Sequence, residues 1–154
     1  MTYHYTYETI LGSVTFVEEN GTFVVITTQH YQAEESICLE TELIKEAYRQ
    51  LTEYLSGKRK EFNLPLLLKG TSFQKQVWEE LMNIPFGETR SYKQIAEAIG
   101  NPKAVRAVGM ANNKNPLLIV VPCHRVIGAN GKLVGYAVGL DKKEFLLKLE
   151  KSLP

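Results

Sequence analysis

The stretch SYKQIAEAIGNPKAVRAVGMANN, residues 91–113, decides how the second half of the chain folds. Ser91 stands three residues before Gln94, and this spacing forms a capping box that starts a helix. Gly100 ends that helix, and the Asn-Pro pair that follows caps and starts a second one. Two short helices joined by so tight a turn predict a helix-turn-helix.

The second of these helices has two chemically different sides. We expect Ala104, Val105 and Val108 to pack against the first helix, and Lys103, Arg106 and Met110 to face outward beside the small residues Ala107, Gly109 and Ala111. Cations among small side chains suit a close approach to a second surface. The alternative is a solvated face on a helix that only packs well, because helix-turn-helix patterns also occur by chance.

Two further capping signals flank this stretch. Thr71 precedes Gln74 by three residues, and Asp141 precedes Glu144 in the same way. With the helix-turn-helix, they predict helices over 72–83, 92–99, 102–113 and 141–151. We therefore expect a mainly α-helical second domain over residues 70–154 that contains the helix-turn-helix.

The first part of the chain carries β-strand signals. The pair Asn20-Gly21 separates two β-rich runs and favours a hairpin, because both residues tolerate positive φ. It predicts strands over 13–18 and 22–28. A covering helix that ends at Gly57 is predicted from five apolar residues at helical spacing: Leu39, Leu43, Ala47, Leu51 and Leu55. The fold class for residues 1–69 is therefore an α/β domain with a small antiparallel sheet and a covering helix.

The composition is that of a folded protein with an uneven charge. Of 154 residues, 44% are hydrophobic, which can supply a core, and the N-terminus has neither a basic leader nor an apolar run. We expect a cytoplasmic location and no membrane association. Residues 1–70 hold 6 Lys or Arg against 10 Asp or Glu, whereas residues 71–154 hold 12 against 7. The basic second half indicates a polyanionic partner, or else an incidental surface.

The cysteines are too few for a disulfide framework. Only Cys38 and Cys123 are present, and inside a cell both are expected to stay reduced. A structural zinc site needs about four Cys or His ligands at short spacing, and here they are scattered. We therefore expect no metal, and we expect Cys38 to be buried.

The segment IVVPCHRVIG, residues 119–128, sets a thiol beside two basic side chains. Pro122 restricts the backbone before Cys123. His124 and Arg125 are poor core residues, so we expect a partly open, electropositive site that lowers the pKa of the thiol from about 8.5. The alternative is an inert cysteine packed in the core.

His124 is not expected to contact the thiol directly. Consecutive side chains of extended backbone point to opposite faces, so a bridging water would have to connect them. A carboxylate, either Glu144 or Glu150, would hold the imidazole in one tautomer. A cysteine hydrolase stays a possible alternative, although its base would have to come from outside this segment.

Residues 72–151 resemble the O6-alkylguanine-DNA alkyltransferases, also called methylated-DNA–protein-cysteine methyltransferases. The most specific features are PCHRVIG and the upstream helix that begins with NPK. Residues 1–70 resemble the variable N-terminal domain of the family more loosely.

The resemblance implies a DNA repair reaction. Such a protein binds duplex DNA through the minor groove, rotates O6-alkylguanine out of the stack and transfers the alkyl group irreversibly to its cysteine, here Cys123. His124 would relay the thiol proton through water, and Glu150 would orient His124. Tyr92 would hydrogen-bond the flipped base, and Asn115 would brace the turn that carries the cysteine.

The resemblance also implies roles for further residues. The base pocket would be lined by Val121, Met110, Tyr136, Ala137 and Val138. The DNA would contact Lys103, Arg106, Ala107, Lys114, Ser91 and Arg90, with Arg106 filling the place of the flipped base. Pro122 and Arg125 would be structural. Val138 is β-branched and narrows the pocket, so methyl adducts are expected to react better than benzyl adducts.

The resemblance implies no cofactor and no metal, because the alkyl group already sits on an activated oxygen. We expect a monomer in the cytoplasm, associated with the nucleoid when bound to DNA. The main alternative is a non-catalytic lesion sensor or regulator that uses the same helices. Family members that only sense damage lack the cysteine, so Cys123 argues against this alternative.

Overall fold

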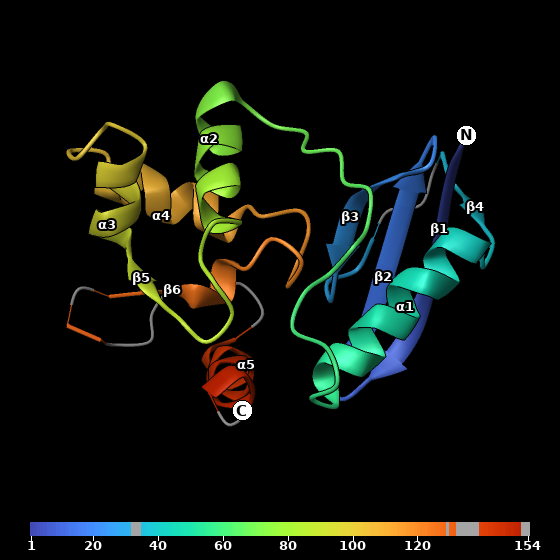
Figure 1. The fold of residues 1–154 in the computed structure, drawn as a ribbon. Helices are drawn as coiled ribbons and strands as arrows, with labels where there is room; N and C mark the ends of the chain where they lie inside the picture. The colour runs from blue at the N-terminus through green and yellow to red at the C-terminus, as the bar shows by residue number, and fades with distance from the viewer. Residues whose placement is uncertain (32–34, 129, 132–138, 152–154) are drawn as a thin grey trace. The chain divides into compact units, whose positions relative to one another are not determined.

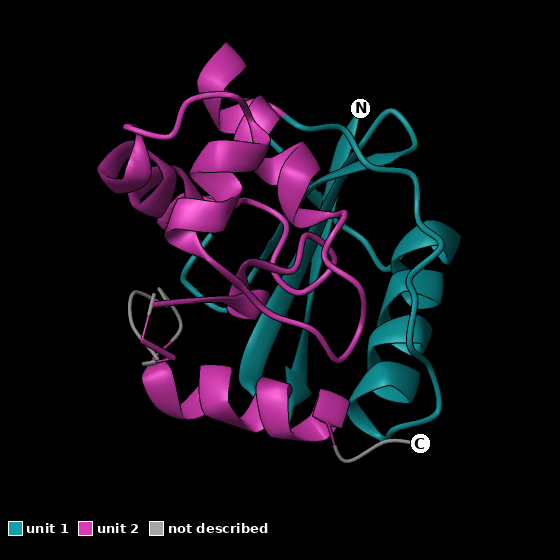
Figure 2. Ribbon diagram, turned by 60° about the vertical axis from the view of Figure 1, so that its left-hand side comes forward, with its two compact units in different colours: residues 1–68 teal, residues 69–154 magenta. Residues whose placement is uncertain are grey.

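The computed structural model describes residues 1–31, 35–128, 130–131 and 139–151 (Figure 1). The chain divides into two compact units, residues 1–68 and residues 69–154, which Figure 2 colours separately. The first unit is a small sheet with a helix, and the second is mainly helical. The predicted order of an α/β part followed by a helical part is therefore confirmed.

The sheet of the first unit has the strand order β3-β2-β1-β4. Its strands are β1 (Thr2–Thr9), β2 (Gly12–Glu19), β3 (Thr22–Thr27) and β4 (Ile37–Cys38). The predicted hairpin is confirmed as β2 and β3, and its turn residues Asn20 and Gly21 have φ of 52° and 81°. The prediction of a purely antiparallel sheet is wrong, because β4 pairs with β1 in parallel.

One strand of this unit was not predicted, and the predicted burial of Cys38 is wrong. The alternation of Tyr3, Tyr5 and Tyr7 with polar residues marks the strand β1, which the sequence analysis did not predict. Cys38 is exposed, because it lies in the two-residue edge strand β4 rather than in the core.

Helix α1 (Glu42–Leu55) lies across one face of the sheet (Figure 1). Thr41 caps it by accepting a hydrogen bond from the backbone N–H of Ile44, and Gly57 with φ of 81° follows its last turn. The prediction that five apolar residues at helical spacing form the buried side of this helix is only partly right, since Leu39 precedes the helix and is 50% exposed. The buried face consists of Ile44, Ala47, Gln50, Leu51 and Tyr54.

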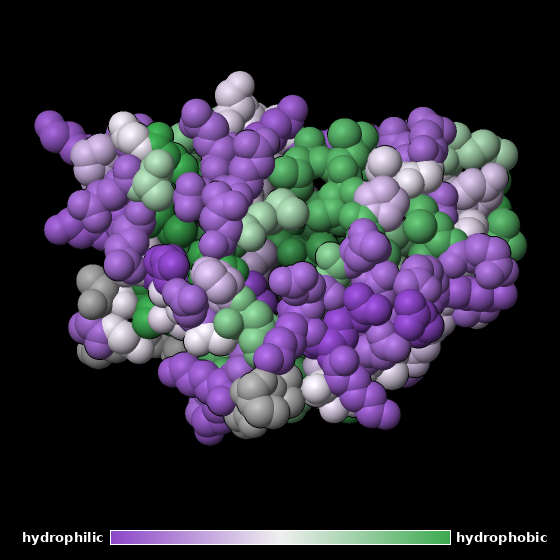
Figure 3. All heavy atoms as spheres, viewed as in Figure 1, coloured by the Kyte–Doolittle hydropathy of each residue, from purple (hydrophilic) through white to green (hydrophobic). Residues whose placement is uncertain are grey.

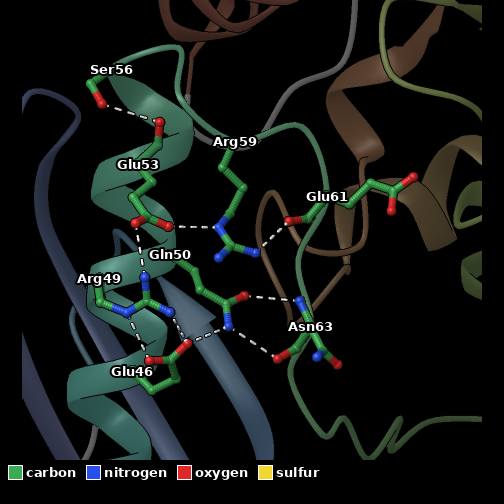
Figure 4. A network of polar contacts seen from close by, with 8 residues as sticks. All are labelled: Glu46, Arg49, Gln50, Glu53, Ser56, Arg59, Glu61 and Asn63. Carbon is green, nitrogen blue, oxygen red and sulfur yellow. Dashed lines mark hydrogen bonds and ion pairs between the residues drawn. The ribbon is translucent and has the colours of Figure 1, made fainter.

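The outer face of α1 is polar. Figure 3 shows hydrophilic residues over this helix. Arg49 forms ion pairs with Glu46 at 2.6 Å and with Glu53 at 2.8 Å (Figure 4). The amide of Gln50 bonds both backbone groups of Asn63, at 2.8 and 3.1 Å, and so fixes the segment that leaves the helix.

The described residues of the second unit form four α-helices, one 3₁₀ helix and a pair of short parallel strands. The helices are α2 (Ser72–Leu81), α3 (Tyr92–Ala98), α4 (Val105–Asn113) and α5 (Leu140–Lys151). Both capping boxes, at Thr71 and at Ser91, are confirmed. Trp78 anchors α2 to α4 by donating to the backbone oxygen of Ala111 at 2.8 Å.

Two helix starts differ from the predictions. Asn101 does not cap α4: its oxygen accepts from the N–H of Ala104 in a separate turn, and the helix begins only at Val105. Asp141 does not cap α5, because that helix begins one residue earlier and places Asp141 in its first turn. Gly100, with φ of 79°, ends α3 as predicted.

The parallel strands β5 (Arg90–Ser91) and β6 (Val126–Ile127) join distant parts of the second unit. Strand β5 leads directly into α3, and β6 follows the 3₁₀ helix η1 (Cys123–Arg125). The start of α3 is thereby held beside the segment that contains Cys123. In the part of the chain that the structure describes, no helix has the length and apolar character needed to cross a membrane.

Candidate active site

A compact turn carries Cys123. Ile119 has a positive φ of 70°, and the N–H of Cys123 donates to the oxygen of Val121 at 2.8 Å. Asn115 braces this turn: its Nδ2 donates to the oxygen of Val121 at 2.7 Å, and its Oδ1 accepts from the N–H of Leu117 at 3.0 Å. A non-glycine residue at positive φ is strained, so these bonds hold a backbone that would otherwise relax.

The thiol of Cys123 is buried, with 4% of the residue exposed. Burial raises the pKa of Cys123 to about 11, although a hydrogen bond from Asn115 and the charge of Lys143 both oppose the rise. The expected open site with a lowered thiol pKa is therefore wrong for this structure. The cost of placing a thiolate in a low dielectric exceeds the effect of the neighbouring cation and amide. The thiol is protonated at neutral pH and needs a base to react.

His124 and Arg125 converge on one carboxylate. His124 Nε2 lies 2.8 Å from Glu150 Oε2, and Arg125 reaches the same carboxylate with Nε at 2.9 Å and Nη2 at 2.8 Å. Arg125 also donates through Nη1 to the oxygen of Ile84 at 2.7 Å. Glu150, on α5, therefore orients His124, whereas Glu144 on the same helix pairs with Lys148 at the surface.

The contact with Glu150 defines the imidazole tautomer. A carboxylate oxygen only accepts, so Nε2 of His124 carries the proton and Nδ1 is left as an acceptor. Burial lowers the pKa of His124, and the hydrogen bond and charge of Glu150 oppose this lowering. Among the described protein atoms, Nδ1 is fully buried and has no hydrogen-bond partner. His124 is thus a neutral base with its basic nitrogen available.

Tyr92 and Asn112 complete the polar surroundings of Cys123. Burial raises the pKa of Tyr92, the charge of a Cys123 thiolate adds to the rise, and a hydrogen bond from Asn112 opposes it. Tyr92 therefore keeps its phenolic proton at neutral pH. Helix α4 passes close to this ring at Gly109, where an added Cβ would make an ordinary van der Waals contact of 3.9 Å with Tyr92.

Two buried residues of this site were not predicted from the sequence. Asn112 is 1% exposed, and Lys143 is fully buried and donates through Nζ to the oxygen of Val126. Burial lowers the pKa of Lys143 to about 8, and a Cys123 thiolate would raise it. The burial of these two residues could not be predicted from the sequence, because Asn and Lys on a short helix usually lie on its solvent-exposed face.

The predicted DNA-contacting side of α4 is solvent-exposed. Arg106 is exposed, and so are Lys103, Ala107, Met110 and Lys114. Two expectations for this helix are wrong: Val105 is 37% exposed instead of packed, and Ala111 is buried at 3% instead of exposed. The buried face of α4 consists of Val108, Ala111 and Asn112, which share one side of the helix at spacings of three and four residues.

The remaining predicted residues have various environments. Ser91 uses its hydroxyl as the cap of α3, and Arg90 contacts Glu88 at 3.1 Å. Val121 and Pro122 are buried. Tyr136, Ala137 and Val138 lie outside the described residues.

Within the described ranges, no three His, Cys, Asp or Glu side chains are grouped so that they could hold a metal ion.

Comparison with known proteins places this site in a family. Residues 72–152 match the model of the 6-O-methylguanine DNA methyltransferase DNA-binding domain, and residues 2–68 match that of the ribonuclease-like domain of the same proteins. The chain belongs to the 6-O-methylguanine DNA methyltransferase family. The resemblance inferred from the sequence is thereby confirmed, and it extends over the looser first part.

Several members of the family are close to this chain. A methylated-DNA–protein-cysteine methyltransferase of Methanosarcina acetivorans is 65% identical over 72% of this chain and 71% of its own length. The constitutive enzyme of that name from Bacillus subtilis is 47% identical over 98% of this chain and 96% of its own. The crystal structure of Mycobacterium tuberculosis OGT in complex with DNA has a TM-score of 0.92 and 42% identity, and the match covers 99% of this chain and 95% of that one.

Proposed function

We propose that this protein is a DNA repair methyltransferase that moves the alkyl group of O6-alkylguanine, mainly O6-methylguanine, from duplex DNA to its own Cys123. Family membership and the names of the curated relatives support this function. The observation that carries the assignment of residues is the neutral His124, held by Glu150 at 2.8 Å, beside a buried and protonated thiol.

The chemistry needs a base, a nucleophile and a stabilised leaving group. His124 Nδ1 accepts the thiol proton through a water molecule, because consecutive side chains of the 3₁₀ helix η1 point in different directions. The sulfur then forms a bond to the alkyl carbon while the bond from that carbon to O6 breaks, and the electron pair stays on guanine. The guanine anion then takes up the proton that His124 holds, so guanine leaves as a neutral base and His124 returns to its neutral form. Glu150 stabilises the imidazolium that exists between the two proton transfers.

The reaction ends after one turnover. A thioether has no good leaving group, so no base of the site can release the alkyl group from Cys123. The protein is consumed as it repairs one lesion. The transfer requires no metal or cofactor, because guanine itself is the leaving group.

The DNA would be bound by a helix-turn-helix formed by α3 and α4. The exposed face of α4 combines Lys103, Arg106 and Lys114 with the small Ala107, which supports a close approach to the minor groove. Arg106 would occupy the space that the flipped base leaves. We further propose that one monomer acts on one lesion and that the protein works in the cytoplasm.

A mass measurement tests the function. The protein is incubated with a duplex that carries one O6-methylguanine, and the intact mass is determined. Gain of one methyl group on Cys123, absent in Cys123→Ser, is the expected result. Tight binding without a mass change would contradict the transfer and support the lesion sensor, and neither binding nor transfer would leave the thiol hydrolase.

Arg106→Ala tests the role of the exposed helix face. We expect repair of duplex DNA to slow strongly, while the reaction with a free O6-alkylguanine base changes little, because the free base needs no flipping. Equal losses in the two reactions would assign Arg106 to folding instead. Lys103→Ala serves as the comparison, since a phosphate contact weakens binding uniformly and reduces its salt dependence.

A further inference from the structure

Arg125 is a buried cation that the catalytic scheme above does not use. It follows His124 in η1, and its side chain is 10% exposed. Its guanidinium contacts the carboxylate of Glu150 in two places, with Nε 2.9 Å from Oε1 and Nη2 2.8 Å from Oε2. A two-point contact of this kind fixes the relative position of both groups. Arg125 is therefore bound to the same carboxylate that holds His124.

The two side chains meet at one atom, Oε2 of Glu150. This oxygen accepts from Nη2 of Arg125 at 2.8 Å and lies 2.8 Å from Nε2 of His124. The side chains of His124 and Glu150 are 0% and 1% exposed, so water screens the charges around them only weakly. The charge of Arg125 therefore acts on His124 at short range.

Other charged and titratable groups also surround His124. Lys143 on α5 is a second buried cation, and its Nζ donates to the backbone oxygen of Val126. Cys123 precedes His124, and its thiol is uncharged when protonated. Burial lowers the pKa of His124 most, and the charges of Arg125 and Lys143 lower it further. Helix α2 also packs against η1, and it buries three uncharged residues: Val77, Trp78 and Leu81.

The charge of Arg125 bears on whether the pair of His124 and Glu150 takes up a second proton. One proton already lies between Nε2 and the carboxylate, so a further proton would have to be placed on Nδ1. With Arg125 present, these three side chains carry no net charge, and the added proton would leave a buried positive charge. Without Arg125 the pair is negative, and the same proton would neutralise it. Arg125 thus opposes protonation of Nδ1.

Nδ1 of His124 must be free of a proton in order to accept one. Among the described protein atoms, it is buried and has no hydrogen-bond partner. The thiol of Cys123 needs this acceptor, because burial raises its pKa to about 11. A Glu150 carboxylate without a counter-charge would orient His124 and, at the same time, favour the protonated form that cannot act as a base.

We propose that Arg125 is a positioning residue that offsets the charge of Glu150, so that Glu150 orients His124 without drawing a second proton onto Nδ1. The proposal rests on the proposed function, in which His124 takes the proton of Cys123. Arg125 acts through Glu150 and not on the reacting atoms, and its bond from Nη1 to the oxygen of Ile84 at 2.7 Å holds the guanidinium in place. The same repulsion makes the imidazolium a stronger acid, which favours return of the proton to the guanine anion.

The test follows the pH dependence of methyl transfer. Single-turnover rates are measured between pH 5 and pH 8 with a saturating amount of a duplex that carries O6-methylguanine. Arg125→Gln keeps a polar side chain and removes the charge, so we expect the acidic limb of the profile to rise by about one pH unit or more. On that limb, the rate at a given pH then falls about tenfold relative to the plateau of the same variant.

Two further variants separate charge from structure. Arg125→Lys keeps the charge but loses the two-point contact, so its plateau should fall while its acidic limb stays within about half a pH unit of that of the unmodified protein. Lys148→Gln removes a cation from the surface of α5, where its side chain is 76% exposed, and should leave the whole profile unchanged. Lower plateaus in both Arg125 variants with no movement of the limb would show a merely structural role and overturn the inference.

A measurement on the unmodified protein covers the case in which Arg125→Gln does not fold. Nitrogen NMR shifts of the imidazole report which nitrogen carries the proton, and we expect His124 to be protonated on Nε2 and unprotonated on Nδ1 down to about pH 6. A proton on Nδ1 at neutral pH, together with normal methyl transfer, would overturn this inference alone, as would a raised limb in Arg125→Lys. Lack of a methyl group on Cys123 after incubation with the duplex would overturn the proposed function and this inference with it.

Discussion

The two units each contain a polar network, and the two networks differ in burial. In the first unit, Arg49 contacts Glu46 and Glu53 on the outer face of α1, where the Arg49 side chain is 53% exposed. In the second unit, Glu150 holds His124 and Arg125 with its own side chain only 1% exposed. Distances in both networks lie near 2.8 Å, so geometry alone does not distinguish them.

The difference in burial determines what each network contributes to stability and to the placement of side chains. Exposed ion pairs are screened by water and salt, and they add little to stability. A buried carboxylate is costly to desolvate, and removing one partner leaves another charge unmatched. The Glu150 network therefore fixes the position and tautomer of His124 at a cost in stability that the surface network never incurs.

Glu150→Gln should produce the largest effect. The change leaves the Arg125 guanidinium buried without its counter-charge, so we expect a loss of about 3–5 kcal/mol in the free energy of unfolding. Transfer to Cys123 should fall with it, because His124 loses the group that sets its tautomer. Chemical denaturation and the methyl-transfer assay measure the two effects. Glu144→Gln on the same helix is the control, and comparable losses there would refute the distinction between buried and exposed pairs.

Cys123→Ser should change the pH dependence of stability. The folded-state pKa of Cys123 is raised from 9.0 to about 11, so the unfolded chain ionises first. The protonated thiol of Cys123 therefore makes its full contribution to folding stability below pH 9, and this contribution is lost as the pH rises toward 11. A shift of this size corresponds to about 3 kcal/mol in the free energy of unfolding. The unmodified protein should lose this amount as the thiol ionises, and the Cys123→Ser variant should not. Denaturation curves at pH 8 and pH 10.5 test this, and parallel declines in both proteins would contradict the raised pKa.

The pH profile of methyl transfer should report on His124. Burial lowers the pKa of His124, so the base stays neutral at pH 7 and the rate should fall only well below the ordinary value of about 6.5. Glu150 opposes this lowering, so Glu150→Gln should move the acidic limb to still lower pH while reducing the maximum rate. Rates between pH 5 and pH 8 would show the shift. A limb that moves upward would exclude His124 as the base.

Arg49→Ala should have the smallest effect. Hydrogen bonds from Arg49 and Gln50 hold the pKa of Glu46 at about 2, so the pair is intact above the ordinary carboxylate pKa and weakens as the pH falls toward 2. We expect a slight drop in the melting temperature at pH 7 that disappears in concentrated salt. Lys45→Ala, which breaks the pair with Glu42, is the comparison. A large, salt-independent drop would show that this network is more than a surface feature.

Local signals in the sequence predicted much of the fold. The Asn20-Gly21 turn and the capping boxes at Thr71 and Ser91 are all present, because each depends on residues within a few positions of one another. The start of α4 was misplaced, since the backbone after Asn101 forms a separate turn before the helix. The strand β1 was missed although it forms a local hairpin with β2, because the two residues between the strands, Ile10 and Leu11, are apolar and give no turn signal.

The sequence predicted several residues of the site, but it did not predict their burial or the direction of their pKa shifts. The Cys-His-Arg segment named the reacting group, and the pairing of Glu150 with His124 was one of two alternatives that the sequence left open. No sequence pattern predicted that Asn112 and Lys143 would be buried beside the thiol. Their burial depends on how α4 and α5 pack, and helical spacing alone does not fix it.

Residue identities and spacings alone were enough to indicate the family, the turns and caps, and the side chain that can form a thioether. These follow from residue identity and short-range backbone geometry. The packing of distant elements was needed to show that the thiol is protonated, that Nδ1 of the neutral His124 has no partner among the described atoms, and that Asn112 donates to the oxygen of Cys123. The reason is that pKa values and hydrogen-bond directions depend on dielectric and on neighbours that α4, η1 and α5 bring together, from 11 residues apart for Asn112 and Cys123 to 26 residues apart for His124 and Glu150.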